Sequence, residues 1–362
     1  MKLFQCQCCG LVLHFENTAC LNCGRAVGYL PDEDRMIAVD PDGPLWAAAP
    51  LDAGDTRRWR FCRNWEQSAC NWLVSAGAEG TSDFCIACRH NRTVPDLSDP
   101  VAHSRWQRIE AAKRRLVYQI LRLGLPHPAP GEGHAEPLVF DFLADDPGSG
   151  ARVLTGHDNG VVTIALIEAN DAAREQTRSE MGEAYRTLLG HFRHEVGHYY
   201  WDVLVRDGGA LDRFRALFGD DRQDYAAALQ QHYARGPEPG WQRHHVSAYA
   251  AMHPWEDWAE SWAHYLHMVD TLDTAAAFGM TLDPGVDDEG DLAAEIDFDP
   301  YRSRRVRRLL SAWTPLTVAL NALNRSMGQP DLYPFVLRTT ARDKLGFVHE
   351  VVQKAREAPG NS

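Results

Sequence analysis

The spacing of apolar residues predicts three helices after residue 100. Between residues 101 and 123 apolar side chains such as Trp106, Ile109 and Leu116 recur every three or four positions among arginines and a lysine, and Gly124 and Pro126 end the pattern. The same spacing predicts a long helix over residues 171–205. A tryptophan-rich helix is expected from Pro254 to about residue 269, since proline suits the first helical position.

Strand-like and loop-like segments lie between these helices. Residues 138–142 and 161–167 have the composition of strands, and the second follows the turn signal Asp158-Asn159-Gly160. Residues 126–137 hold four prolines and two glycines and are predicted as a linker, and the acidic residues 283–299 as an exposed loop. The arginines between residues 302 and 308 are expected to neutralise that acidic loop.

The composition is that of a globular protein, with 44% hydrophobic and 24% charged residues. The formal net charge of −13 argues against nucleic acid or an anionic membrane as the main partner. No apolar run reaches the ~18 residues that a membrane-spanning helix needs. The first residues also lack the apolar stretch of a secretory signal, so we expect a cytoplasmic protein whose thiols stay reduced or bind metal.

The cysteines separate the front of the chain from the rest. All nine lie between Cys6 and Cys88, which predicts a metal-rich β region over residues 1–100, a helix and linker over 101–134, and a second domain over 135–362. Four of them form two C-x2-C knuckles separated by ten residues, the spacing of a tetrahedral four-thiolate zinc site. These ligands are Cys6, Cys9, Cys20 and Cys23.

A second quartet is predicted to bind another structural zinc ion. It ends in a third C-x2-C knuckle, although seven residues separate its first two members. Cys8 lies inside the first knuckle and is expected to be a spare thiol. Disulfides and a redox role fit the context less well than zinc. The second quartet consists of Cys62, Cys70, Cys85 and Cys88.

One local basic cluster occurs in this front region. Arg57, Arg58, Arg60 and Arg63 lie beside two tryptophans, a composition that nucleic-acid sites share. Residues 1–100 nevertheless carry nine Lys and Arg against thirteen Asp and Glu, and thiolate zinc sites add further negative charge. A nucleic-acid partner is therefore disfavoured.

The strongest catalytic signal is His194-Glu195-Val196-Gly197-His198, inside the long predicted helix. At 100° per residue the two histidines lie about 40° apart and one turn apart along the axis, so both imidazoles can reach one zinc ion. Glu195 projects to one side, where it can act as a general base on a water molecule that the metal activates. His191 is expected to be a surface histidine or to support the ligands.

A catalytic zinc needs a third protein ligand, and the tryptophan-rich helix offers two. Glu256 and Glu260 lie one turn apart among bulky apolar residues, so one can bind zinc while the other hydrogen-bonds a ligating histidine. The residues alone leave other ligands open, namely Asp202, His244, His245 and His253.

These residues resemble the zincin metallopeptidases of the glutamate-ligand type, most closely the bacterial zinc-binding metallopeptidases with an amino-terminal zinc ribbon. The resemblance rests on the cysteine knuckles, the segment His-Phe-Arg-His-Glu-Val-Gly-His-Tyr-Tyr-Trp-Asp over residues 191–202, and the helix around Glu256. In anthrax lethal factor, a tyrosine stands seven residues before the ligating glutamate and another glutamate four after it. Tyr249, Glu256 and Glu260 match that spacing.

The resemblance implies an α+β fold, with a small zinc-ribbon region followed by a mostly helical zincin-like domain that contains a small sheet. It implies zinc ligation by His194, His198 and Glu256, with Glu260 as hydrogen-bond partner of a ligating histidine. It also implies Glu195 as general base and Tyr249 as donor to the oxyanion. Residues 161–167 would be the edge strand that receives the substrate backbone.

The function predicted on this basis is zinc-dependent hydrolysis of peptide bonds, with one catalytic and two structural zinc ions and a protein or peptide substrate. One alternative is a zinc-ribbon interaction module with a silent peptidase domain. Another is a nucleic-acid reader that delivers a protease, which the acidic composition disfavours.

Overall fold

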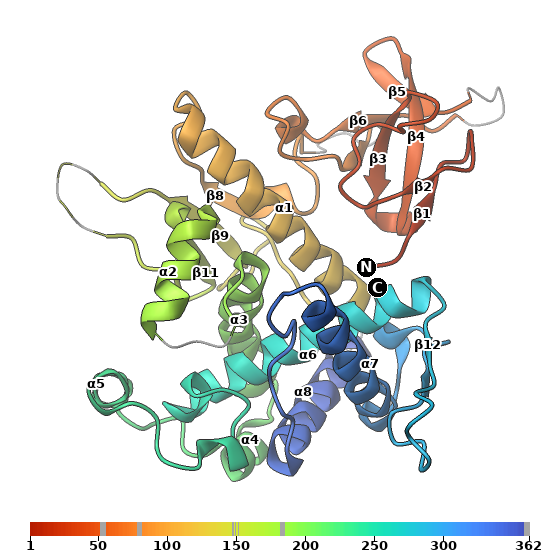
Figure 1. Cartoon of the computed structure of the whole chain (residues 1–362). Coiled ribbons are helices and arrows are strands. Elements are labelled where there is room, and N and C mark those ends of the chain that lie inside the picture. Colours follow the sequence, from red (N-terminus) through yellow and green to blue (C-terminus); the bar gives the residue numbers. More distant parts are fainter. Residues whose placement is uncertain are drawn as a thin grey trace. The chain divides into compact units, whose positions relative to one another are not determined.

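The computed structural model of the chain describes residues 1–50, 56–77, 82–146, 148, 150, 152–181 and 185–357 (Figure 1). Contacts between residues divide it into two compact units. The first contains Met1–Leu121, His127–Thr155 and Gly160–Asn170, and the second contains Arg122–Pro126, Gly156–Asn159 and Asp171–Ser362. This division groups the helix after residue 100 and the strands that follow it with the cysteine-rich region, whereas the composition had suggested boundaries near residues 100 and 134.

The first unit begins with small β structures built around the cysteines. Strands β1 (Phe4–Gln5) and β2 (Val12–Leu13) form an antiparallel hairpin. A five-stranded antiparallel sheet follows, and its apolar core includes Leu30, Ile37 and Trp59. Its strands are β3 (Ala26–Leu30), β4 (Arg35–Asp42), β5 (Leu45–Ala48), β6 (Trp59–Phe61) and β7 (Leu73–Ser75).

Helix α1 (Pro100–Leu123) occupies the predicted segment.

A four-stranded sheet has the strand order β10-β11-β9-β8. The predicted Asn159-Gly160 turn is present, and both residues adopt positive φ, 47° and 83°, as a tight hairpin requires. The strands are β8 (Asn91–Thr93), β9 (Val139–Leu143), β10 (Gly156–Asp158) and β11 (Val161–Ala165).

The prediction that residues 161–167 form an edge strand is wrong. Strand β11 ends at Ala165 and lies between β9 and β10 in the sheet, so it has partners on both sides. The short strand β10 is at the edge instead. A run of seven β-prone residues predicts a strand but not its place in the sheet, which depends on pairing with residues far away in sequence.

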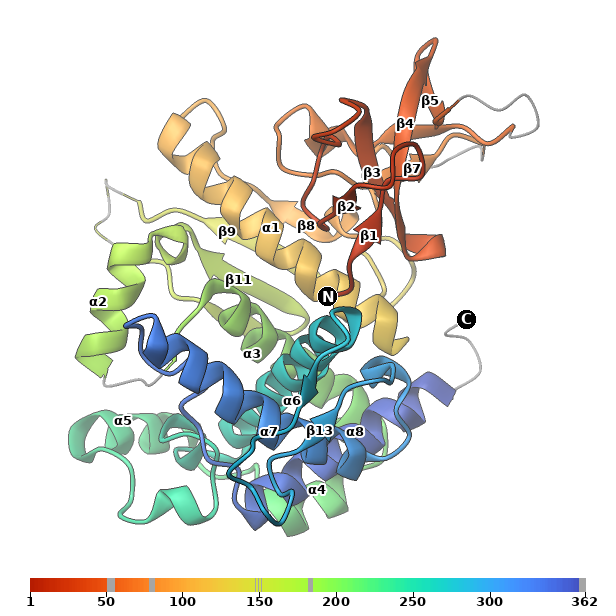
Figure 2. The same cartoon turned by 45° about the vertical axis from the view of Figure 1, so that its right-hand side comes forward.

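The second unit is built around helix α6 (Pro254–Ala277), which extends two turns past its predicted end. Figures 1 and 2 show α3 (Leu188–Tyr200), α7 (Val306–Ser326) and α8 (Thr339–Glu357) packed beside it. Seventeen of its residues are buried, including Trp258 and Trp262, which explains why so apolar a helix is stable in water. Other helices are α2 (Asp171–Met181), α4 (Leu211–Phe218) and α5 (Tyr225–Arg235).

The prediction of one continuous helix over residues 171–205 is wrong. Helix α2 ends at Met181, and α3 starts after Thr187, whose hydroxyl accepts a hydrogen bond from the Gly190 amide. The α-helix then changes to a π-helix over Trp201–Arg206. A serine or threonine cap can begin a new helix without disturbing the spacing of apolar residues. The spacing alone therefore predicted one helix where the structure has α2 and α3.

The acidic segment also differs in part from a plain loop. Strands β12 (Thr281–Leu282) and β13 (Ala294–Glu295) pair across it. Asp299 and Asp297 form ion pairs with Arg302 and Arg308, so acidic and basic segments do neutralise each other at these positions. Among the described residues, no helix is both long and apolar enough to cross a bilayer. The predicted class, a strand-rich region followed by a mostly helical domain, is confirmed.

Candidate metal centre and active site

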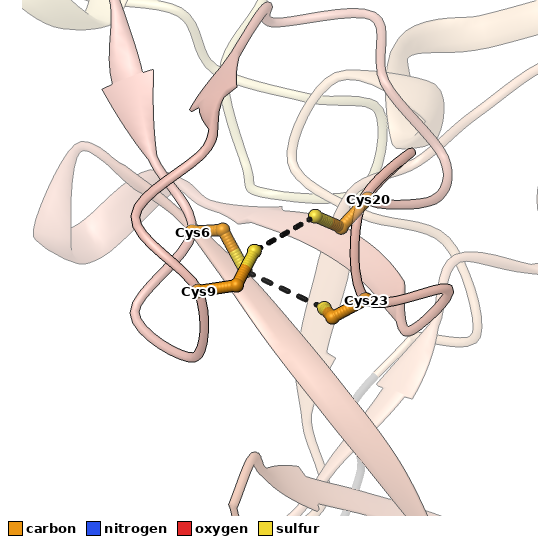
Figure 3. A group of neighbouring side chains, drawn as sticks. All are labelled: Cys6, Cys9, Cys20 and Cys23. Atoms are coloured by element: carbon orange, nitrogen blue, oxygen red, sulfur yellow. Dashed lines mark hydrogen bonds between the residues drawn. The ribbon is translucent and has the colours of Figure 1, made fainter.

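The structure brings together the first cysteine quartet (Figure 3). The sulfur atoms of Cys9 and Cys20 are 3.5 Å apart and those of Cys6 and Cys23 are 3.8 Å apart, and all four lie within 4.8 Å of one another. Two of the four side chains are partly exposed. Four sulfurs at these distances surround a space that fits a tetrahedral zinc ion.

Cys8 does not belong to this group. Its thiol donates to the Ala49 carbonyl oxygen over 3.0 Å. Burial raises the pKa of the Cys8 thiol. This geometry agrees with the expectation of a spare thiol rather than a ligand.

The second quartet is buried at every position. The sulfurs of Cys70 and Cys85 are 3.7 Å apart, and Cys62 and Cys88 complete the group. The seven-residue spacing between the first two members is therefore compatible with a closed site, because the chain between them turns through a short 3-10 helix, Arg63–Trp65.

Three charged side chains of α1 surround this second quartet. Glu110 lies 3.6 Å from the Cys88 sulfur and forms an ion pair of 2.9 Å with Lys113, and both side chains are fully buried. Burial alone would lower the pKa of Lys113, but Glu110 and Cys88 raise it above its usual value. Arg114 is buried too, and burial lowers its pKa, but the nearby Cys70, Cys88 and Glu110 together with Cys85 raise it above the usual value. Two buried cations therefore face the thiol group.

The basic cluster near Trp59 is compensated by acidic partners. Arg57 forms an ion pair with Glu33 at 2.7 Å, and Arg60 with Asp83 at 3.7 Å. Arg58 pairs with Asp42. These contacts neutralise three of the four arginines of the cluster.

Helix α3 is held close to α6 at the centre of its His-Glu-x-x-His segment. A Cβ atom on Gly197 would lie 3.2 Å from the Ala259 Cα and 3.2 Å from Trp262, so only glycine permits this approach without displacement. The Trp258 indole donates to the Gly197 carbonyl oxygen over 2.8 Å. This contact places the ligand-bearing faces of the two helices opposite each other.

The structure brings His194, His198 and Glu256 together as one group, in which His198 and Glu256 are buried and His194 is partly exposed. Their ligand atoms lie within 4.8 Å of one another. The Nε2 atom of His194 is 2.9 Å from Glu256 Oε2, and that of His198 is 3.6 Å from Glu256 Oε1. The His198 ring lies against the Trp255 ring at a centroid distance of 3.7 Å, which fixes its orientation.

Glu260 supports this group from the far side of His194. Its Oε1 is 2.8 Å from His194 Nδ1, and its Oε2 accepts a hydrogen bond of 2.5 Å from the Ser247 hydroxyl. A carboxylate at Nδ1 holds the proton on that nitrogen, so that Nε2 is the nitrogen that could give up its proton and bind a metal ion. This arrangement is the one expected of a second carboxylate that orients a histidine ligand.

Charge and burial act in opposite directions on the pKa values of this group. Burial disfavours the charged form of His194, but hydrogen bonds with Glu256 and Glu260 outweigh it and raise the His194 pKa well above its usual value. Burial likewise opposes ionisation of Glu256, yet His198 and His194 hold its pKa well below the usual range. Two imidazole nitrogens and one carboxylate, almost wholly buried, are a donor set that zinc prefers. The residues present therefore fit a zinc ion.

The two predicted catalytic side chains lie beside this group. Glu195 is partly buried and directly follows His194 on α3. Tyr249 is on a short 3-10 helix, Tyr249–Ala251, with its ring centroid 5.9 Å from that of His194. Burial and the charge of Glu256 raise the pKa of Tyr249, which keeps its phenol protonated.

One residue of the site was missed by the sequence analysis. Tyr225, the first residue of α5, donates its hydroxyl to Glu256 Oε1 over 2.8 Å. Burial and Glu256 raise its pKa too. No motif marks Tyr225, because it lies 31 residues before its partner in a different helix.

The other ligands that the sequence left open are used elsewhere. Asp202 pairs with Arg206 at 2.7 Å. The Nδ1 atom of His253 accepts from the Trp255 amide as the cap of α6, and its Nε2 lies 3.2 Å from the Gln223 carbonyl oxygen. His245 is 3.1 Å from Asp257. Neither these residues nor His191 and His244 join a metal-binding group among the described residues.

Comparison with known proteins identifies two family models that match the chain. A family model described as "Putative zinc-binding metallo-peptidase" matches residues 102–351, and a zinc-ribbon domain model matches residues 3–99. Uncharacterized proteins of Mycobacterium bovis and Mycobacterium tuberculosis are 39% identical to the chain over 355 residues, 98% of this chain and 96% of theirs. No solved structure matches.

Proposed function

The chain belongs to a family of zinc-binding metallopeptidases with an amino-terminal zinc ribbon, and on that premise we propose that it hydrolyses peptide bonds with His194, His198 and Glu256 as zinc ligands. The observation that carries this proposal is the convergence of these three side chains within 4.8 Å in one group, in which His198 and Glu256 are buried. When bound, the zinc ion supplies Lewis acidity to the attacking water and to the substrate carbonyl.

The side chains around the ligands have separate roles. Glu195 takes the proton of the attacking water and passes it to the leaving amine, as its neighbouring position on α3 permits. Tyr249 donates its hydroxyl to the oxygen that gains negative charge during attack. Glu260 fixes the orientation and tautomer of His194 through the 2.8 Å contact with Nδ1.

The edge strand β10 is the best candidate to receive the substrate backbone. It packs against α3, and its His157 ring centroid is 6.2 Å from that of His198. As the terminal strand of the sheet, it presents backbone groups with which an extended peptide can pair. The substrate class is therefore an extended peptide or an unfolded protein segment.

We assign one catalytic and two structural zinc ions to each chain. The two cysteine quartets have closed four-sulfur geometry, whereas the histidine and glutamate group offers three ligands. A three-ligand site keeps a coordination position open for chemistry, and a four-thiolate site does not. Elemental analysis of the purified protein tests this count, and a single zinc per chain would contradict it.

The decisive experiment pairs zinc analysis with proteolysis. The variant Glu195→Gln is nearly isosteric and removes only the general base, so it should keep three zinc ions and lose peptide cleavage. Wild type and variant are incubated with a broad peptide library and with denatured protein, and the products are identified by mass spectrometry. A fully metallated wild type that cleaves no more than Glu195→Gln would contradict proteolysis and favour an interaction module with a silent peptidase domain.

A further inference from the structure

Tyr225 reaches the candidate active site from α5, a helix that carries none of the residues identified from sequence. Its hydroxyl donates to Glu256 Oε1 over 2.8 Å and is also within hydrogen-bonding reach of the Tyr249 phenol. Its ring packs edge-on against His253 and Trp255, at centroid distances of 5.4 and 5.9 Å. The phenol is thus fixed in place at the start of α6.

Each oxygen of Glu256 has a different set of neighbours. Oε2 faces His194 Nε2 at 2.9 Å, whereas Oε1 receives the Tyr225 hydroxyl and lies 3.6 Å from His198 Nε2. A carboxylate without such a bond can rotate about its last carbon–carbon bond and offer a metal either oxygen, or both. The hydrogen bond from the phenol restricts this freedom, because rotation would break the bond between Tyr225 and Oε1.

We propose that Tyr225 is a positioning residue whose hydroxyl holds Oε1 of Glu256, so that Glu256 presents a single oxygen, Oε2, to the metal. The inference rests on the proposed function in that it takes Glu256 as a ligand. Ligation through one oxygen keeps the remaining coordination position available to water and substrate. The hydrogen bond also orients Glu256 when no metal is bound, which raises the affinity by lowering the cost of ordering the ligand.

The competing explanation is that Tyr225 only packs against Trp255 and His253. The two explanations differ in what loss of the hydroxyl does to metal binding. Tyr225→Phe keeps the ring and removes the hydrogen bond. Tyr265→Phe is a matched control, because Tyr265 is buried in α6 and its hydroxyl bonds to His349 Nδ1 over 3.0 Å, away from the ligands.

The experiment measures the zinc dissociation constant of the three-ligand site by competition with a chelator, while the cysteine quartets stay filled. We expect Tyr225→Phe to weaken zinc binding by about 10- to 100-fold, the usual effect of losing a hydrogen-bond partner of a ligand. Tyr265→Phe should bind zinc as the wild type does. Circular dichroism and the unfolding midpoint of the protein, both measured without zinc in the three-ligand site, verify that both variants fold.

A second variant gives an independent reading. Glu256→Asp withdraws the carboxylate from the phenol, so adding Tyr225→Phe to it should cause no further loss of affinity. Additive losses, or a Tyr225→Phe affinity within twofold of wild type, would overturn the positioning role. A wild type that binds no third zinc would instead overturn the proposed function, so the two failures are distinguishable without any measurement of cleavage.

Discussion

The buried charges around the second cysteine quartet predict that substituting Lys113 destabilises the protein more than substituting its ion-pair partner Glu110. Glu110 and Lys113 are both fully buried and 2.9 Å apart, so truncating either would ordinarily leave an uncompensated charge. The quartet changes this balance. Four thiolates around a divalent ion carry a net charge of about −2, beside which Glu110 adds one negative charge and Lys113 and Arg114 add two positive ones.

The consequence for each variant follows from this balance. Lys113→Met leaves the thiolates and Glu110 facing Arg114 alone, and we expect a loss of about 3–5 kcal/mol, the usual cost of breaking a buried pair. Glu110→Gln leaves two cations beside a doubly negative centre, which is electrically neutral. The glutamine still accepts from Asn91 and Lys113, so the loss should be about 1 kcal/mol, the worth of one altered hydrogen bond.

Thermal unfolding of the zinc-loaded protein measures the difference. A loss of 3 kcal/mol corresponds to a midpoint about 6–12 °C lower for a unit of this size. Arg213→Met, which breaks an exposed ion pair with Glu350, is the control and should leave the midpoint nearly unchanged. If Glu110→Gln destabilises the protein as much as Lys113→Met, the quartet is not the negative centre that this reasoning requires.

Two further predictions concern metal release and pH. A chelator should remove zinc from the first cysteine quartet before the second, because Cys9 and Cys23 are partly exposed whereas all four cysteines of the second quartet are buried. Zinc release is measured with a colorimetric indicator, and the variants Cys9→Ser and Cys88→Ser identify which site releases the ion. Release from the second quartet first would contradict the role of burial. Burial lowers the pKa of His264 to about 4, so the free energy of unfolding should fall as the pH drops from about 6.5 towards 4, because the unfolded state binds the proton first. Between pH 7 and pH 5 the protonation of His264 should lower the free energy of unfolding by about 2 kcal/mol. Urea unfolding at both pH values should show that His264→Gln lacks this decrease. The same decrease in His264→Gln as in the wild type would refute the role of His264.

Helical periodicity accounts for the part of the candidate site that the sequence could place. His194, His198, Glu256 and Glu260 follow one another by four positions within their helices, so each pair faces one direction whatever the rest of the fold does. The structure brings these two pairs together, with Glu260 at His194 Nδ1. The choice between Glu256 and the other possible ligands could not come from spacing alone, since it depends on which helix crosses α3.

Features that depend on contacts between distant segments were not predictable in this way. Four of the five strands β3 to β7 have five residues or fewer, so neither alternation nor length identifies them. Tyr225 joins the site only because α5 places its first residue beside Glu256. The position of β11 inside the sheet likewise follows from pairing with β9, 22 residues earlier in register.

Gly197 shows how the motif and the second helix depend on each other. The pattern His-Glu-x-x-His treats this position as free, yet a side chain there would press on Ala259 and Trp262 and require them to shift. Ala259 lies three residues after Glu256, so the contact with Gly197 is on the side of α6 next to that glutamate. The close approach of the helices therefore sets the distance between His194 and Glu256 before any metal binds. A catalytic centre of this kind is assembled by helix packing, and the zinc ion completes an arrangement that the chain has already made.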